Sequence, residues 1–230
     1  MTLVTAFLRF YMTKMKAVLF DCDGLMFNTE QISQDMWREE ARKYGEKLSD
    51  TFFQNITGAK KGVDISAFLN ETPHLNEISL VMRKKRFNLS FWSSFPKDTL
   101  NKKGLVELVH FLEEKHIHRA VCSSSEKEYV STLLHSVSVP LSFDCIIGGD
   151  SIVHGKPDPE IFLKASNLLG VLPEECLVLE DSKQGILAAH RANMHSVFIQ
   201  DTIIPDEEME QVLDYRCDSL CEVIELLGRI

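Results

Sequence analysis

The sequence predicts an α/β fold in which a doubly wound parallel sheet carries an inserted α-helical cap domain. Two observations predict the sheet. Short apolar runs of strand length alternate with segments whose apolar residues recur at helical spacing, and polar or glycine residues follow the ends of the runs. This alternation predicts parallel strands covered by helices on both faces. A third observation predicts the insert, because residues 28–95 contain helical patterns and no strong strand run.

The first predicted strand is 17–20, an unbroken apolar run with turn residues behind it. Asp21 and Asp23 follow directly, so two carboxylates lie just past the end of a buried strand, where open α/β sheets bind ligands. Gly24 allows a backbone turn that a residue with a Cβ would resist. Two like charges this close disfavour joint ionisation unless a cation shares them, which suggests Mg²⁺. A solvated turn at the strand end is the alternative.

The segment 28–95 begins with a helical pattern that we expect to end at Gly45, and Pro96 marks the end of the segment. The predicted organisation is therefore an N-terminal extension over 1–15, a Rossmann-like core made of 16–27 and 96–230, and a helical cap domain over 28–95. In the core, the pattern predicts further strands at 119–122, 143–147, 176–179 and 196–199, and helices at 103–115, 126–135, 159–169, 183–192 and 220–227.

Composition narrows the classes of function and partner. The formal net charge of −9 argues against a nucleic-acid binder, whose surface would be basic. Six cysteines form no CxxC pair, and most lie in or beside apolar runs, which is typical of a reducing cytoplasm. The apolar run 3–10 is too short to span a bilayer. We expect a cytoplasmic protein with no nucleic-acid or membrane partner. The sequence leaves the oligomeric state open, and a monomer is the expectation.

Four groups of polar residues can meet at one edge of the predicted sheet: Asp21 with Asp23, Ser123, Lys156, and Glu180 with Asp181. Each group has a structural alternative. The serines at 123–125 could cap the following helix, and Lys156 could be an exposed loop lysine. Glu180 and Asp181 could be a charge pair that a helix start favours. Any one signal is weak, but all four in this order are hard to explain by chance.

The segments DCDGLMFNTE, VCSSS, GKPDP and LVLEDSKQGILAA resemble the four motifs of the haloacid dehalogenase superfamily, in the family's order. The resemblance covers nearly the whole chain from Lys16, and the helical insert stands where the phosphatase-like branch carries its cap. It points to small-molecule phosphatases and β-phosphoglucomutase-like proteins. It therefore implies a Mg²⁺-dependent phosphatase that acts on a small phosphorylated metabolite, with a sugar phosphate as the expected substrate.

The resemblance assigns the chemistry to the two aspartates of the first motif. Asp21 would be the nucleophile and form an aspartyl-phosphate. Asp23 would protonate the leaving oxygen and then deprotonate the attacking water, while its backbone carbonyl binds Mg²⁺. Haloacid dehalogenases and phosphonatases lack the second aspartate, so Asp23 favours phosphoryl transfer.

The other three motifs would hold the phosphoryl group and the metal. The resemblance implies that Ser123 and nearby amides, with Ser124 beside it, bind the phosphoryl group, and that Lys156 neutralises its charge. Asp181, with Glu180 beside it, would complete the Mg²⁺ site alongside Asp21. A carboxylate cannot approach a phosphate dianion unless a metal and a cation offset the repulsion, which agrees with this assignment.

A β-phosphoglucomutase-like sugar-phosphate mutase is the first alternative, because both enzymes use the two aspartates in the same roles. The mutase pattern has a histidine ten residues after the second aspartate, where this chain has Ser33. Asn28 is a second departure, at a point where an acidic residue is common. A non-catalytic binding protein is an alternative of another class. A binding protein would not need both a nucleophile and an acid/base, so the presence of Asp21 and Asp23 together argues against this alternative.

Basic residues of the predicted cap are candidates for gripping the distal groups of a substrate: Lys60, Lys61, Arg83, Lys84 and Lys85. Solvated surface charge is the alternative for any single one of them. Lys61 is the preferred candidate because it follows the turn at Thr57 and Gly58, which is expected to face the cleft.

Overall fold

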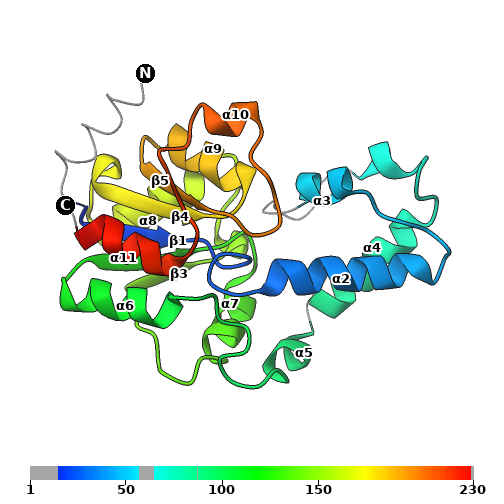
Figure 1. The fold of residues 1–230 in the computed structure, drawn as a ribbon, viewed down its shortest axis with the longest axis horizontal. Helices are drawn as coiled ribbons and strands as arrows, with labels where there is room; N and C mark the ends of the chain where they lie inside the picture. Colours follow the sequence, from blue (N-terminus) through cyan, green and yellow to red (C-terminus); the bar gives the residue numbers. More distant parts are fainter. Residues whose placement is uncertain (1–14, 57–64, 87, 229–230) are drawn as a thin grey trace.

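A six-stranded parallel sheet forms the centre of the computed structural model, which describes residues 15–56, 65–86 and 88–228 (Figure 1). The strands stand in the order β3-β2-β1-β4-β5-β6. Their bounds are Ala17–Phe20 for β1, His118–Cys122 for β2, Cys145–Ile147 for β3, Cys176–Glu180 for β4, His195–Ile199 for β5 and Tyr215–Cys217 for β6. The doubly wound parallel sheet is therefore confirmed.

The register of the central strands brings three chain segments to one edge. Phe20, the last residue of β1, pairs with Val121 on one side and with Leu179 on the other. The residues that follow each strand therefore emerge beside one another. The strand order also reverses between β1 and β4, because β2 and β3 extend the sheet on one side of β1 while β4 begins the other side. Doubly wound sheets bind ligands at this switch point.

Helices cover both faces of the sheet. Val18 and Phe20 point to one face, which α6 (Leu105–Glu114), α7 (Lys127–Leu134) and α11 (Leu220–Gly228) cover. Ala17 and Leu19 point to the other face, against α8 (Glu160–Leu169) and α9 (Lys183–Arg191). Successive side chains of a strand alternate between faces, so an apolar run with no polar break is what a sheet buried on both sides requires.

The sequence pattern missed two short elements at one end of the sheet. Strand β6 is only three residues long, lies at the edge and has the exposed Arg216 at its centre, so it leaves no apolar run. Helix α10, Glu207–Glu210, is a single turn. The strand expected at 143–147 is also shorter, because only Cys145–Ile147 pairs with β2.

The inserted helices lie together beside the layered core, at the right of the view (Figure 1). They are α2 (Thr29–Arg42), α3 (Asp50–Ile56), α4 (Leu75–Arg86) and α5 (Leu89–Ser93), with a 3₁₀ turn at Ser66–Phe68. Helices α2 and α4 pack through Ala41, Ile78 and Met82. The helical cap domain is thus confirmed, while its limits at 28 and 95 stay a prediction. Two further 3₁₀ turns, Gly149–Ser151 and Pro173–Glu175, belong to the core.

The expectations about membrane contact and about the cysteines can be compared with the structure. None of the helices in the described ranges combines the length and apolar character that a membrane crossing requires. All six cysteines are free thiols. The N-terminal extension expected at 1–15 lies outside the described residues except for Met15, which is buried.

Candidate active site

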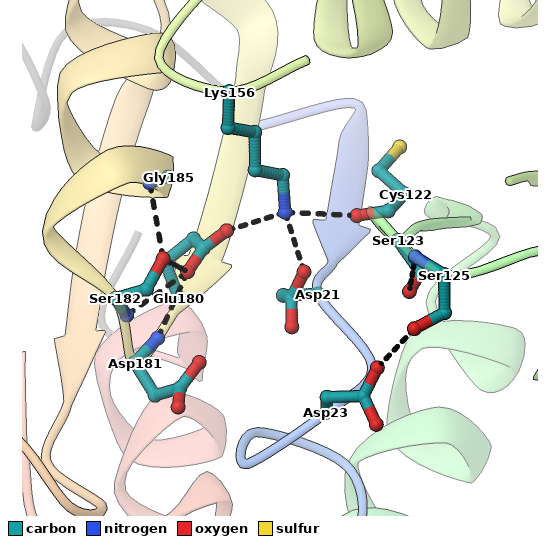
Figure 2. A network of polar contacts seen from close by, with 10 residues as sticks. All are labelled: Asp21, Asp23, Cys122, Ser123, Ser125, Lys156, Glu180, Asp181, Ser182 and Gly185. Atoms are coloured by element: carbon teal, nitrogen blue, oxygen red, sulfur yellow. Dashed lines mark hydrogen bonds and ion pairs between the residues drawn. The ribbon is translucent and has the colours of Figure 1, made fainter. Parts of the chain in front are cut away.

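Lys156 lies at the centre of the switch point, between the ends of β1, β2 and β4 (Figure 2). Its Nζ donates hydrogen bonds to Oδ1 of Asp21, to Oε1 of Glu180 at 2.5 Å and to the backbone oxygen of Cys122 at 3.0 Å. The side chain is 1% exposed. The alternative of an exposed loop lysine is therefore wrong, and the loop that carries Lys156 delivers a cation into the interior.

The site contains more carboxyl groups than Lys156 could balance if all of them were ionised. Burial acts to lower the pKa of Lys156, but Asp21 and Glu180 together outweigh it and raise that pKa above its ordinary value, so the lysine is charged. Burial also raises the pKa of Asp21, to about 8, although Lys156 opposes this and Glu180 adds to it. One lysine faces several carboxylates, which leaves room for a further cation.

Glu180 is fixed by the start of α9. Its Oε2 accepts hydrogen bonds from the backbone N–H groups of Asp181 and Ser182, each at 3.1 Å, and from Oγ of Ser182 at 2.9 Å. Ser182 caps the helix by accepting from the N–H of Gly185 at 3.0 Å. A Cβ at Gly185 would collide with the Glu180 carboxylate, so this close approach requires glycine. Both carboxylate oxygens of Glu180 are thus engaged by the protein.

Asp181 is the carboxylate that protein groups satisfy least. It is 1% exposed, and its Oδ2 has no hydrogen-bond partner among the described residues. Burial, followed by the charges of Asp21 and Glu180, raises its pKa well above the ordinary value. Gly24 lies directly against it, because a Cβ on Gly24 would collide with the same Oδ2. Gly24 also has φ +82°, so the turn expected there is confirmed.

These residues fit a magnesium ion. Asp21, Glu180 and Asp181 each offer a carboxylate oxygen, and the three oxygens lie within 4.8 Å of one another. Hard carboxylate oxygens are the protein ligands that Mg²⁺ prefers, and the unpartnered Oδ2 of Asp181 is a buried polar atom in need of one. A divalent cation would also favour the ionised forms of Asp21 and Asp181, which burial disfavours.

Asp201 is a further carboxylate beside this group that sequence reasoning missed. It follows β5, forms an ion pair with Lys102, and contributes to the raised pKa of Asp181. Its Oδ2 is also buried without a partner among the described residues. The signal was present in the sequence, since an acidic residue just past a predicted strand end meets the same sheet edge as Asp21 and Asp181.

The second aspartate of the first motif, Asp23, is held by three hydroxyl groups. Thr29 Oγ1 at 2.7 Å and the Tyr129 hydroxyl at 2.9 Å donate to its Oδ1, and Ser125 Oγ donates to its Oδ2 at 2.7 Å. Figure 2 shows this last contact. Thr29 and Ser125 stand inside the motif segments but were not singled out, whereas Tyr129 gave no signal beyond an apolar position on a helix.

Ser123 is buried at the end of β2, and its Oγ accepts a hydrogen bond from the N–H of Ser125 at 3.0 Å. Ser124 lies between them in the same loop. The serines do not cap the next helix, since α7 begins at Lys127, whose N–H donates to Oδ1 of Asp150 at 3.0 Å. The capping alternative is therefore wrong. The Ser123 hydroxyl still has its own proton to donate, because in that bond it acts as the acceptor.

The cap candidates separate into three groups. Lys60 and Lys61 lie outside the described residues. Arg83 and Lys84 are exposed on α4. The Nζ of Lys85 donates to Oε2 of Glu40 at 3.0 Å, so this charge is used within the cap.

Comparison with known proteins gives consistent matches. The model of haloacid dehalogenase-like hydrolases matches residues 18–199. A phosphorylated carbohydrates phosphatase of Thermotoga maritima is 31% identical over 186 residues, which cover 80% of this chain and 84% of that protein. The β-phosphoglucomutase of Bacillus subtilis is 28% identical over 190 residues, covering 80% and 82%. The crystal structure of a hydrolase from Pseudomonas syringae shares the fold, with a TM-score of 0.71 at 20% identity over 93% of this chain and 98% of that one.

Proposed function

The chain belongs to the haloacid dehalogenase-like hydrolase family and is a phosphatase, and we propose that it hydrolyses a small phosphorylated metabolite, above all a sugar phosphate. The reaction would require Mg²⁺ and pass through an aspartyl-phosphate on Asp21. One observation carries this proposal: a buried lysine, Lys156, contacts Asp21 and Glu180 at the switch point, beside Asp181.

Asp21 and Asp23 divide the chemistry between them. A carboxylate oxygen of Asp21 attacks phosphorus, the bond from phosphorus to the alkoxy oxygen of the substrate breaks, and Asp23 gives its proton to that oxygen. A water molecule then attacks the phosphorus of the aspartyl-phosphate and gives a proton to Asp23. The bond from phosphorus to the Asp21 oxygen breaks, so inorganic phosphate leaves and the Asp21 carboxylate is regenerated. Both aspartates are less than one-tenth exposed, which keeps competing water away from the reacting atoms.

Mg²⁺ would be held by Asp21 and Asp181, by the backbone carbonyl of Asp23 and by Glu180. When bound, it supplies positive charge that lets an anionic nucleophile approach an anionic phosphate. The unpartnered oxygen of Asp181 supports that residue most directly. Glu180 has both oxygens hydrogen-bonded to the protein, so its ligand role is the least supported of the four.

Lys156, Ser123 and Ser124 would bind the phosphoryl group. The raised pKa of Lys156 keeps its charge at neutral pH, although burial opposes this, so it offsets charge on the phosphoryl oxygens throughout the reaction. Ser123 is buried at the end of β2 and can donate its hydroxyl proton. Lys61 remains a candidate for contact with the distal part of the substrate.

A sugar phosphate is the proposed substrate because the Thermotoga maritima relative is named for phosphorylated carbohydrates. The mutase is the second candidate, supported by the similarity to the β-phosphoglucomutase of Bacillus subtilis. Ser33, on α2 and partly buried, stands where the mutase pattern has histidine, and this favours hydrolysis. A cytoplasmic location is part of the proposal and rests on the six free thiols.

Phosphate release from a panel of phosphorylated sugars and nucleotides tests the proposal, with and without Mg²⁺, for the wild type and Asp21→Asn. We expect release that needs Mg²⁺ and is lost in the folded Asp21→Asn variant. Conversion of β-glucose 1-phosphate to glucose 6-phosphate without free phosphate, given a bisphosphate primer, would instead identify the mutase. Release that persists in Asp21→Asn would overturn the assigned nucleophile.

A further inference from the structure

Tyr129 joins Asp23 to the hydrophobic core. The tyrosine lies on α7, is 2% exposed and packs within the cluster that covers one face of the sheet. Its hydroxyl lies 2.9 Å from Oδ1 of Asp23. A buried tyrosine hydroxyl requires a polar partner, and here the hydroxyl donates to that carboxylate oxygen. The bond links a rigid aromatic side chain to the proposed acid/base.

The three hydroxyls on Asp23 come from different parts of the chain. Thr29 is the first residue of α2, where the chain enters the cap, and Ser125 belongs to the loop after β2. Both have short side chains, one in a loop and the other at the first residue of a helix. Tyr129 stands on a helix of the core and its ring is packed in the hydrophobic cluster, so it restrains the position of the carboxylate more strongly than the other two.

Helix α5, which leads from the cap back to the core, packs directly against Tyr129. Trp92, on α5, meets the ring of Tyr129 edge to face, with centroids 5.6 Å apart and an interplanar angle of 86°. Trp92 is itself 2% exposed and contacts Phe91 and Phe95 at 5.1 and 6.1 Å. Helices α5 and α7 lie next to each other at the base of the cap (Figure 1). Trp92 therefore limits how the Tyr129 ring can move.

We propose that Tyr129 is a positioning residue for proton transfer by Asp23, and that Trp92 holds its ring in place. This inference rests on the proposed acid/base role of Asp23. It has a specific consequence. The position of Asp23 matters for a leaving group that must be protonated as it departs, and matters little for a leaving group that is stable as an anion. A residue that only stabilises the fold would affect both kinds of substrate equally.

A series of aryl phosphates distinguishes a residue that positions Asp23 from a residue that only stabilises the fold. The values of kcat/KM for 2,4-dinitrophenyl, p-nitrophenyl and phenyl phosphate report the steps up to release of the phenol, whose need for a proton rises along the series. For Tyr129→Phe, we expect about a tenfold fall with phenyl phosphate, the size of one charge-assisted hydrogen bond, and less than about twofold with 2,4-dinitrophenyl phosphate. Trp92→Leu should likewise lower kcat/KM more for phenyl phosphate than for 2,4-dinitrophenyl phosphate.

Two control variants are compared with Tyr129→Phe. Tyr44→Phe removes a hydroxyl from a tyrosine on the cap that is 39% exposed, and should leave the whole series unchanged. Asp23→Asn should show a steeper dependence on the leaving group than Tyr129→Phe. A uniform fall in Tyr129→Phe while Asp23→Asn remains steep would overturn the proposal for Tyr129 and leave the function of Asp23 intact. A flat series in Asp23→Asn would instead count against the proposed function.

A structural measurement tests the positioning without any need for activity. In crystal structures, the Asp23 carboxylate should keep one orientation in the wild type and in Tyr44→Phe, and take at least one other in Tyr129→Phe. An Asp23 side chain unchanged in Tyr129→Phe would overturn the proposal, whether or not the protein hydrolyses any of the phosphates.

Discussion

Lys156 donates a hydrogen bond to Oδ1 of Asp21, although 135 positions separate the two residues in the sequence. The same Nζ reaches Oε1 of Glu180 and the carbonyl oxygen of Cys122, so one side chain joins the ends of three strands. Because it is the cation that contacts both carboxylates in the described structure, it controls the charge balance of the site and the approach of an anionic substrate.

Replacing Lys156 tests this balance. In Lys156→Met, the buried carboxylates lose their cation, so we expect the free energy of unfolding of metal-free protein to fall by about 3 kcal/mol. We also expect kcat/KM for phosphate release to fall by at least about a hundredfold. Chemical denaturation and phosphate assays measure the two effects. Lys103→Met, at an exposed lysine of the core, is the control. Equal stability of the two variants would contradict the central role of Lys156.

Metal-free protein should lose stability as the pH rises. Burial raises the pKa of Asp21 to about 8, against 3.8 when it is exposed, and the pKa of Asp181 shifts in the same direction. Between about pH 4 and about pH 8, the unfolded chain has released this proton while the folded protein keeps it, so unfolding becomes more favourable with rising pH. From about pH 5 to about pH 8, the Asp21 contribution is up to about 4 kcal/mol.

Thermal or chemical unfolding in EDTA across this range measures the slope. Asp21→Asn should make the slope shallower, because asparagine does not titrate and only the contribution of Asp181 is left. Added Mg²⁺ should stabilise the wild type more at the alkaline end, since a cation binds ionised carboxylates. A stability that rises with pH in EDTA for the wild type would contradict the raised pKa of Asp21.

The contact between Gly24 and Asp181 predicts a site-specific cost of adding one methyl group. Gly24 and Gly45 both have positive φ, +82° and +74°, but of these two only Gly24 has neighbours, among the residues that the structure describes, that a Cβ would meet. Gly45→Ala should therefore cost about 1 kcal/mol from backbone strain alone. Gly24→Ala should cost about 3 kcal/mol, and the displaced Asp181 should weaken binding of Mg²⁺.

Denaturant unfolding compares the two glycine variants, and calorimetric titration with Mg²⁺ measures the effect on the metal. If Gly24→Ala cost no more than Gly45→Ala and bound Mg²⁺ as the wild type does, the Asp181 side chain would not lie against Gly24 as described.

Glu40 joins two helices of the cap. Its Oε2 accepts hydrogen bonds from Lys43 at 2.8 Å and from Lys85 of α4 at 3.0 Å, and these bonds lower the pKa of Glu40. A lowered pKa means that the stabilisation is complete above the unfolded value of 4.5 and is lost as the pH falls further. Glu40→Gln should cost about 1 kcal/mol or less near neutral pH, because both lysines are partly solvated.

The cost of Glu40→Gln should disappear on acidification. Glu39→Gln, at an exposed carboxylate of the same helix, is the matched control and should be close to neutral throughout. Hydrogen exchange of the α2 and α4 amides localises the effect to the cap. A loss of stability in Glu40→Gln that grew on acidification would contradict the lowered pKa.

The sequence predicted those strands of this protein whose apolar runs were long enough to be recognised as a strand pattern. The runs at 17–20 and 176–179 are buried on both faces, so they contain no polar break, and the acidic residues after them mark the edge of the sheet. Strand β6 lacked such a run because only one of its three residues is buried. A short edge strand is specified by its neighbour in the sheet more than by its own composition.

By itself, the sequence determined the doubly wound sheet, the inserted helices and the polar groups that meet at the sheet edge. Most of these polar residues lie within a few positions of the end of a predicted strand, so the strand pattern also locates them. Only the tertiary structure decided that Lys156 is buried, that one oxygen of Asp181 has no partner within the described part of the chain, and that Tyr129 donates a hydrogen bond to Asp23. These contacts join residues far apart in the chain. Their existence depends on how helices pack over the sheet, and periodicity specifies which face of a helix is apolar without specifying which atoms that face meets.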